Sequence, residues 1–247
     1  MHIYQRKINL DGADSLSRIA LAIPTNSELL DVGTGTGALG EFLNSQRNCL
    51  LDGVNYNSEE IAIARPFYRE LHVANLEQTL LSQLFTGKRY DFIVFADVLE
   101  HLRNPAQTLA DARQLLKPGG RVIISLPNIA YSGVIADLLA GQFNYTEEGI
   151  LDQTHVQFFT RDSLYRLLCN GGFKPTRWDQ IIRQPGESEF RHRYPDSLPP
   201  PLWQALSANP DALTYQFIVE AVATDAAVAE AAMPARLPPE FGFMVQV

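Results

Sequence analysis

Long hydrophobic runs are absent from the 247-residue sequence, although 46% of its residues are hydrophobic. A membrane-spanning helix needs roughly 18 or more consecutive apolar residues, so the sequence predicts no membrane span. The first ten residues, MHIYQRKINL, contain no apolar core of the kind found in signal peptides, so we expect none and predict a cytoplasmic protein. No internal repeat is visible, which argues against a solenoid or a propeller.

Cysteine and positive charge are also scarce. Cys49 and Cys169 are far apart in the sequence and form no metal-ligand pair, so we expect two reduced thiols. The 20 Lys and Arg residues are outnumbered by 28 Asp and Glu residues, for a formal net charge of −8. A protein with this acidic balance is not attracted to the phosphates of nucleic acids or to anionic membrane surfaces. Both kinds of partner are therefore disfavoured.

Short apolar segments alternate with segments of helical periodicity along most of the chain. Continuous apolar runs such as IVF and VIIS are typical of strands buried on both faces. Helix-start signals follow several of these runs, such as Ser58 as an N-cap, or Asn104 as an N-cap followed by Pro105. This alternation predicts βαβ units and a mainly parallel sheet. Strands are expected near 28–33, 48–56, 70–76, 89–97, 117–128, 174–182 and 213–224, and helices near 37–46, 58–68, 79–85, 104–116, 131–141 and 161–170.

The regular alternation ends at about residue 128, where the domain organisation becomes less uniform. We expect one domain over residues 1–224, which includes a capping segment at about 128–160. Residues 183–213 are rich in proline and predict a long surface excursion. We expect residues 225–247 to form a tail that is ordered only where it docks on the domain.

A glycine-rich loop, LLDVGTGTGALG, lies between the first expected strand and the first helix. Gly33, Gly35 and Gly37 let the backbone turn tightly and approach a ligand closely. The spacing from Gly33 to Ala38 also fits the dinucleotide fingerprint, so a nicotinamide enzyme is one interpretation. Asp31 argues against it, because its carboxylate would oppose the pyrophosphate and would instead suit a ligand with an ammonium group and hydroxyls.

The order of several segments resembles the class I S-adenosylmethionine-dependent methyltransferases over roughly residues 15–182. The matching pieces are LLDVGTGTGALG, GVNYNSEEIAIAR, VANLE, YDFIVFADVLEHLRNPAQTL and LLKPGGRVIISLPN. The resemblance implies an α/β fold, a Rossmann-like three-layer sandwich whose mainly parallel seven-stranded sheet has its last strand antiparallel, plus a capping insertion. It also implies S-adenosylmethionine as the cofactor, bound by Asp31, Gly33, Thr34, Gly35, Gly37, Asn55, Tyr56, Asn75, Leu76 and Asp97.

Two of these positions depart from the family pattern. The family usually has an acidic residue at the end of the second strand, where this chain has Asn55, and often an Asp where this chain has Asn75. An amide lacks the strength of a charge-assisted bond to a ribose hydroxyl, a difference of about 1 kcal/mol per bond. We therefore expect weaker cofactor binding, and a non-catalytic cofactor-binding scaffold subunit stays open as an alternative.

A second signature covers residues 125–173 and resembles a methyltransferase subgroup of bacterial polysaccharide and glycoconjugate pathways. It is carried by Pro127-Asn128, Leu151-Asp152, Thr154-His155 and Phe158-Phe159-Thr160. In such folds the segment after the fifth strand covers the pocket and contacts the acceptor. The resemblance therefore implies that Asn128, Asp152 and His155 hold a substrate hydroxyl.

The stretch DVLEHL places Asp97, Glu100 and His101 directly after a buried strand. If the turn is helical, the three side chains lie on one side of it, and His155 approaches them from the cap. Small-RNA terminal 2′-O-methyltransferases show a similar turn, so these four residues could hold Mg²⁺ or Mn²⁺. Three interpretations of these residues are open: substrate positioning or a polar cap, a general base, and a metal site. The metal site is not the favoured one.

The expected function is O-methylation of a saccharide, a glycoconjugate or another small polar metabolite. Methyl transfer is an in-line displacement that needs alignment and a base for the hydroxyl proton. His155 is our first candidate for this base and His101 the second, because imidazole titrates near neutral pH. A metal-assisted 2′-O-methyltransferase acting on RNA ends is the alternative enzyme. The expected partner is a small-molecule or glycan acceptor, and a homodimer stays open.

Overall fold

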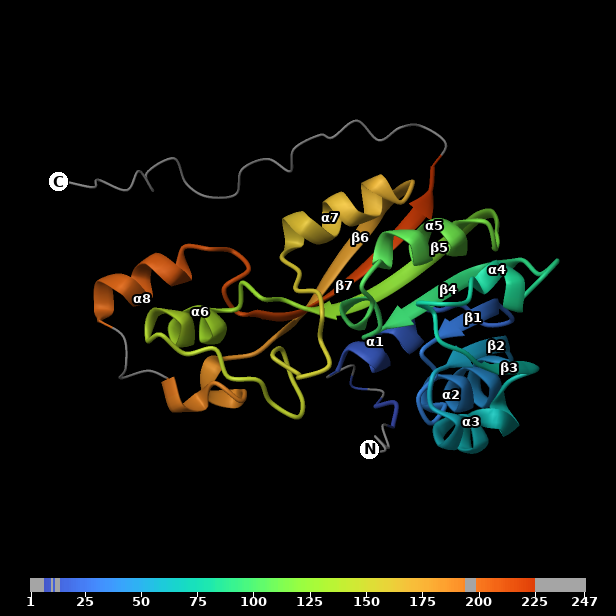
Figure 1. Cartoon of the computed structure of the whole chain (residues 1–247), viewed down its shortest axis with the longest axis horizontal. Helices are drawn as coiled ribbons and strands as arrows, with labels where there is room; N and C mark the ends of the chain where they lie inside the picture. Colours follow the sequence, from blue (N-terminus) through green and yellow to red (C-terminus); the bar gives the residue numbers. More distant parts are fainter. Residues whose placement is uncertain (1–6, 10, 12–13, 194–198, 225–247) are drawn as a thin grey trace.

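The computed structural model describes residues 7–9, 11, 14–193 and 199–224. One seven-stranded sheet runs through the molecule in the order β3-β2-β1-β4-β5-β7-β6 (Figure 1). Strands β1 to β5 pair in parallel, and β7 is antiparallel to both of its neighbours, so the predicted α/β fold is confirmed. The strands are β1 (Glu28–Val32), β2 (Leu50–Asn55), β3 (Glu70–Val73), β4 (Tyr90–Ala96), β5 (Leu116–Pro127), β6 (Phe173–Ile182) and β7 (Thr214–Ala223).

Helices cover both faces of this sheet. Because side chains alternate along a strand, Leu30 and Val32 pack into one apolar layer and Leu29 into the other. Asn104 caps its helix and Pro105 is the first helical residue, as predicted. Ser58 is not an N-cap, however. The helices are α1 (Ser15–Ala22), α2 (Ala38–Arg47), α3 (Ser58–Ala64), α4 (Leu81–Leu84), α5 (Pro105–Arg113), α6 (Ser132–Leu139), α7 (Arg161–Asn170) and α8 (Pro200–Ser207), with 3-10 turns η1 (Arg65–Phe67), η2 (Leu99–His101), η3 (Pro185–Glu187) and η4 (Arg191–Arg193).

The start of α3 differs from the prediction by one residue. Asn57 is the N-cap, because its side chain accepts a hydrogen bond of 2.9 Å from the backbone N–H of Glu59. Ser58 is the first helical residue instead. An Asn-Ser pair offers two good caps in a row, so the sequence alone does not decide which one the chain uses.

A cap lobe extends beyond the carboxyl end of β5 and contains α6, η3, η4 and α8 (Figure 1). It has its own apolar cluster, formed by Tyr131, Val134, Ile150, Leu151, Phe190 and Tyr215. The predicted proline-rich excursion therefore holds a helix that the sequence analysis missed. Pro200 begins α8 at a position where no backbone N–H is needed, so proline is no obstacle there. The predicted tail, 225–247, lies outside the described residues.

No helix in the described part of the chain is both long enough and apolar enough to span a membrane.

Candidate functional site

The glycine loop joins β1 to α2 at the carboxyl edge of the sheet. Gly33, Gly35 and Gly37 have φ angles of +81°, +51° and +87°, which favour glycine. A Cβ on Gly33 would lie 2.5 Å from Val98 Cγ2, and one on Gly37 would lie 2.8 Å from Ala64 Cα. A Cβ on Gly35 would meet no described atom within 4 Å beyond its chain neighbours. The outer two glycines thus serve packing, and the middle one leaves room for a ligand.

Asp31 lies in β1 just before this loop and is 2% exposed. The Tyr68 hydroxyl donates a hydrogen bond of 2.6 Å to its Oδ2. Burial raises the pKa of the Asp31 carboxyl to about 6, against the lowering effect of the Tyr68 hydrogen bond. At neutral pH the site therefore holds a costly buried negative charge, which a ligand's ammonium group could compensate.

Replacing Asp31 by Asn is expected to stabilise the ligand-free protein at pH 7.5 by about 1–3 kcal/mol. The folded pKa exceeds the ordinary value of 3.8, so the carboxyl's contribution to stability is fully present below pH 3.8 and lost as pH rises through about 6. The advantage of the variant should therefore grow between pH 4.5 and 7.5. Denaturant unfolding at both pH values measures it, and an unchanged difference would contradict the prediction. Calorimetric titration should show at least tenfold weaker S-adenosylhomocysteine binding.

The end of β2 carries a carboxylate that the sequence analysis missed. Asn55 donates a hydrogen bond of 2.7 Å from Nδ2 to Oε2 of Glu60, which lies in α3. The sequence does contain a signal, the acidic pair that follows Ser58, but acidic residues are favoured in a first helical turn and do not by themselves indicate a ligand. Asn55 and Glu60 together could accept hydrogen bonds from ribose hydroxyls. This pairing weakens the argument that Asn55 makes the chain a non-catalytic scaffold.

The remaining predicted cofactor residues lie around the same edge. The Tyr56 side chain is 65% exposed, and Leu76 packs partly against the main apolar core. Asn75 Oδ1 accepts a hydrogen bond of 2.9 Å from the backbone N–H of Glu77, so the amide closes a turn. Thr34 is 7% exposed. Their contacts with cofactor stay predictions.

Asp97 directly follows β4 and has a φ of +56°, in the left-handed region that is costly for a residue other than glycine. Its Oδ1 accepts hydrogen bonds from Ser125 Oγ, at 2.9 Å, and from Gln216 Nε2. The helical turn begins only at Leu99, so the expectation that Asp97 shares a helical face with Glu100 and His101 is wrong. The carboxylate lies against β5 and β7 instead.

His101 and His155 come together, although they are 54 residues apart in the sequence. Their ring centroids lie 4.8 Å apart at an interplanar angle of 69°. The Glu100 carbonyl accepts backbone hydrogen bonds from Val156, at 2.9 Å, and from Gln157, at 3.0 Å. These two bonds attach the capping segment to the turn after β4 and so bring His155 to His101.

Hydrogen bonds at Nδ1 orient both imidazoles. His155 Nδ1 lies 3.0 Å from the Ile150 carbonyl, which only accepts, so the proton is on Nδ1 and Nε2 carries the lone pair. His101 Nδ1 lies 3.1 Å from Thr154 Oγ1, whose own proton goes to Asp152 Oδ1 at 2.6 Å. His101 Nε2 therefore also carries a lone pair. Burial and the neighbouring His155 lower the pKa of His101, which favours the basic form.

Glu100 completes a cluster with the two histidines. It is 1% exposed, and one donor atom from each of Glu100, His101 and His155 lies within 4.8 Å of the other two. Two imidazole nitrogens and a carboxylate oxygen suit a divalent transition metal. The structure thus brings together three of the four residues in the predicted metal set, and Asp97 is not among them.

Asn128 is not available to a substrate, contrary to the sequence prediction. It is 0% exposed, and Nδ2 donates to the carbonyls of Asp211, at 3.1 Å, and Thr214, at 2.8 Å. Its Oδ1 accepts from the backbone N–H two residues later. Asn128 thus joins the end of β5 to the segment before β7.

Asp152 holds Thr154 by two hydrogen bonds, so it acts on His101 through Thr154.

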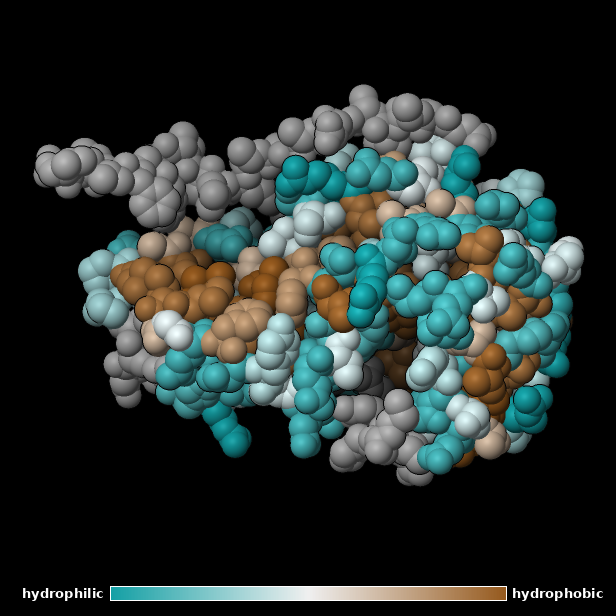
Figure 2. Space-filling model, viewed as in Figure 1, coloured by the Kyte–Doolittle hydropathy of each residue, from teal (hydrophilic) through white to brown (hydrophobic). Residues whose placement is uncertain are grey.

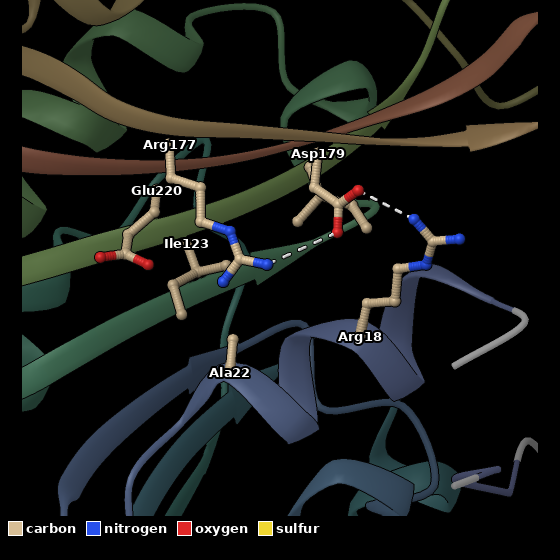
Figure 3. Close-up of a pocket in the computed structure, with 7 residues that line it drawn as sticks. Arg18, Ala22, Ile123, Arg177, Asp179 and Glu220 are labelled. Carbon is tan, nitrogen blue, oxygen red and sulfur yellow. Dashed lines mark hydrogen bonds and ion pairs between the residues drawn. The ribbon is translucent and has the colours of Figure 1, made fainter. Parts of the chain in front are cut away.

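A small pocket lies elsewhere, between α1 and strands β5, β7 and β6 (Figure 3). Asp179 forms ion pairs with Arg18, at 2.8 Å, and with Arg177, at 3.9 Å. The Arg18 contact holds α1 to β6, the edge strand of the sheet. The pocket contains none of the residues predicted to bind cofactor or acceptor; it is lined by Arg18, Ala22, Ile123, Arg177, Asp179, Ile218 and Glu220.

The sheet order, the glycine loop at its carboxyl edge and the covering lobe define a Rossmann-like methyltransferase fold. A family model described as a methyltransferase domain matches residues 4–177, and the chain belongs to that family. It is an S-adenosylmethionine-dependent methyltransferase, with S-adenosylmethionine as its cofactor.

Two curated relatives and one solved structure illustrate the likeness. The chain is 34% identical over 106 residues to a ubiquinone biosynthesis O-methyltransferase of Saccharophagus degradans, covering 41% of this chain and 44% of that one. It is 25% identical over 166 residues to one from Coxiella burnetii, covering 66% and 70%. A SAM-dependent methyltransferase from Archaeoglobus fulgidus has a TM-score of 0.58 at 16% identity, covering 83% and 90%. The comparisons support the family but not the predicted polysaccharide subgroup.

Proposed function

We propose that this methyltransferase transfers the methyl group of S-adenosylmethionine to a hydroxyl oxygen of a small molecule. The observation that carries the proposal is the pair of oriented imidazoles at the carboxyl edge of the sheet, where ligands of open α/β sheets bind. The relatives' names support oxygen as the methylated atom, because both are called O-methyltransferases.

The chain's part in the reaction is alignment and proton removal. S-adenosylmethionine supplies a methyl group on a positively charged sulfur, so an oxygen nucleophile can displace the thioether in line. His155 Nε2 takes the proton of the acceptor hydroxyl as the oxygen–carbon bond forms. The Nδ1–H bond to the Ile150 carbonyl then stabilises the imidazolium, as does the nearby Glu100 carboxylate.

The capping segment is the proposed acceptor-binding element. Residues 128–160 contain no Lys or Arg but four acidic residues, Asp137, Glu147, Glu148 and Asp152. Such a segment repels phosphate groups, which speaks against an RNA end. Among the predicted acceptors, a saccharide and another small polar metabolite stay proposals. The relatives' names favour a hydroxyl compound of quinone biosynthesis.

A metal-assisted reaction is a second candidate, favoured by one specific observation. The donor atoms of Glu100, His101 and His155 lie close enough for a modest side-chain adjustment to place them around one divalent ion. The ion would bind an acceptor oxygen and lower the pKa of its hydroxyl. The assay below separates the two candidates.

The test is to measure S-adenosylhomocysteine formation by the purified protein with catechols, hydroquinones, methyl glycosides and a short RNA as acceptors. Each reaction is run with chelator and with Mg²⁺ or Mn²⁺. Turnover of a small hydroxyl compound supports the proposal, and turnover only with metal favours the second candidate. Tight S-adenosylhomocysteine binding without turnover of any acceptor would instead support the non-catalytic scaffold.

A further inference from the structure

Aromatic side chains form a continuous row that ends at the proposed base. Tyr145 lies 5.5 Å from Phe143, which lies 5.9 Å from Phe158, all between ring centroids. Phe158 lies 6.4 Å from His155, which in turn contacts His101. Every contact in the row is edge-to-face, with interplanar angles of 69° to 90°. The row thus links the base to the outer part of the capping segment.

The outer end of this row is exposed. Tyr145 is 56% exposed and Phe143 is 40% exposed, while Val156, beside His155 in the sequence, is 47% exposed. Leu138 and Leu139 at the end of α6 are 47% and 55% exposed. Figure 2 shows hydrophobic residues gathered on the cap lobe over α6 and α8. Single exposed apolar residues need no explanation, but a series continuous with a catalytic group indicates a binding surface.

The charge of the capping segment restricts what binds there. With four acidic residues and no Lys or Arg between 128 and 160, the segment offers no cation to a phosphate or carboxylate. The nearest buried cation along the chain, Arg161, is neutralised by Asp211, through hydrogen bonds of 2.7 and 2.5 Å. The row therefore suits an uncharged ligand with a large apolar or aromatic surface.

We propose that this row binds the acceptor, an uncharged phenol or hydroquinone with an apolar substituent: Phe158 holds its ring with the hydroxyl toward His155, and Phe143 and Tyr145 bind the substituent. This inference rests on the proposed function, because it takes His155 as the base of an O-methyl transfer. A phenol also suits the chemistry: its hydroxyl is far more acidic than that of a sugar, so a neutral imidazole removes its proton more readily. The apolar substituent lies along the exposed outer part of the row.

The experiment compares catechol with catechols that carry butyl and nonyl chains, for the wild type and for Phe143→Ala, Tyr145→Ala and the double variant. The wild-type kcat/KM should rise at least tenfold from catechol to nonylcatechol. In the double variant it should fall 10- to 100-fold for nonylcatechol but less than threefold for catechol, with unchanged S-adenosylhomocysteine affinity. Leu50→Ala, an exposed leucine at the amino end of β2, is the matched control.

Each contrary result has a separate meaning. A kcat/KM that is independent of chain length, or a preference for a methyl glycoside, would overturn the inference but leave O-methyl transfer in place. If no acceptor is methylated, the proposed function fails. Calorimetric binding of nonylcatechol to the S-adenosylhomocysteine complex then tests the row directly. Binding that the double variant loses supports the row, and absent or unchanged binding overturns it.

Discussion

Replacing His155 by alanine is expected to lower turnover by about 10²- to 10⁴-fold, the usual contribution of a general base. His155 is 9% exposed, and its Nδ1 bond to the Ile150 carbonyl leaves Nε2 as the basic nitrogen. S-adenosylhomocysteine should bind with wild-type affinity, because the glycine loop after β1, the predicted cofactor-binding element, makes no hydrogen bond to this ring among the described residues. Steady-state kinetics and calorimetric titration measure the two effects.

His101→Ala should cost less than His155→Ala, and His192→Ala in η4 is the control histidine. Unchanged turnover would remove His155 from the mechanism. A parallel loss of turnover and S-adenosylhomocysteine affinity would show that the ring has a structural role instead.

Replacing Asp211 by alanine is expected to lower the free energy of unfolding by about 3–5 kcal/mol, the typical cost of leaving one member of a buried ion pair alone. Arg161 donates from Nε and Nη2 to both carboxylate oxygens of Asp211, and the two side chains are only 9% and 12% exposed. The guanidinium also lies 4.8 Å from the ring centroid of Trp178 and 4.9 Å from that of Phe217. Urea unfolding followed by tryptophan fluorescence measures the change.

Asp162→Ala provides the matched control, because Asp162 pairs with Arg166 on the exposed side of α7. That pair should contribute less than about 1 kcal/mol. An equally small effect of Asp211→Ala would show that solvent or other partners satisfy Arg161. If Asp211→Ala does not fold, Asp211→Asn keeps the side-chain shape and one acceptor oxygen, but it puts an amide NH2 donor against the guanidinium and should still be clearly destabilised.

The glycine loop and the strand–helix alternation were predicted from the sequence because both depend on local chemistry. Gly33 and Gly37 allow a backbone that other residues resist, and runs such as IVF show burial on both faces. The helix α8 was missed because proline content was taken as evidence of a loop, although proline is favoured in a first helical turn.

The candidate site was predicted only in part. His101 and His155 were expected to meet, and they do. The prediction that Asn128 binds substrate was wrong. Its position in the motif does not show that backbone groups already occupy both its amide nitrogen and its amide oxygen. The carboxylate of Glu60 beside Asn55 was missed, because the geometry of one helical turn against a strand end decides that contact.

The sequence by itself determined the fold class and the position of the glycine loop, and it singled out His101 and His155 as candidates. Periodicity, glycine spacing and residue type carry that information directly along the chain. Only the tertiary structure decided which way Asp97 points, which imidazole nitrogens are basic, and that Tyr145, Phe143 and Phe158 line up toward His155. These features depend on how the cap lobe packs against the turn after β4, and contacts between residues more than 50 positions apart leave no periodic signal in the sequence.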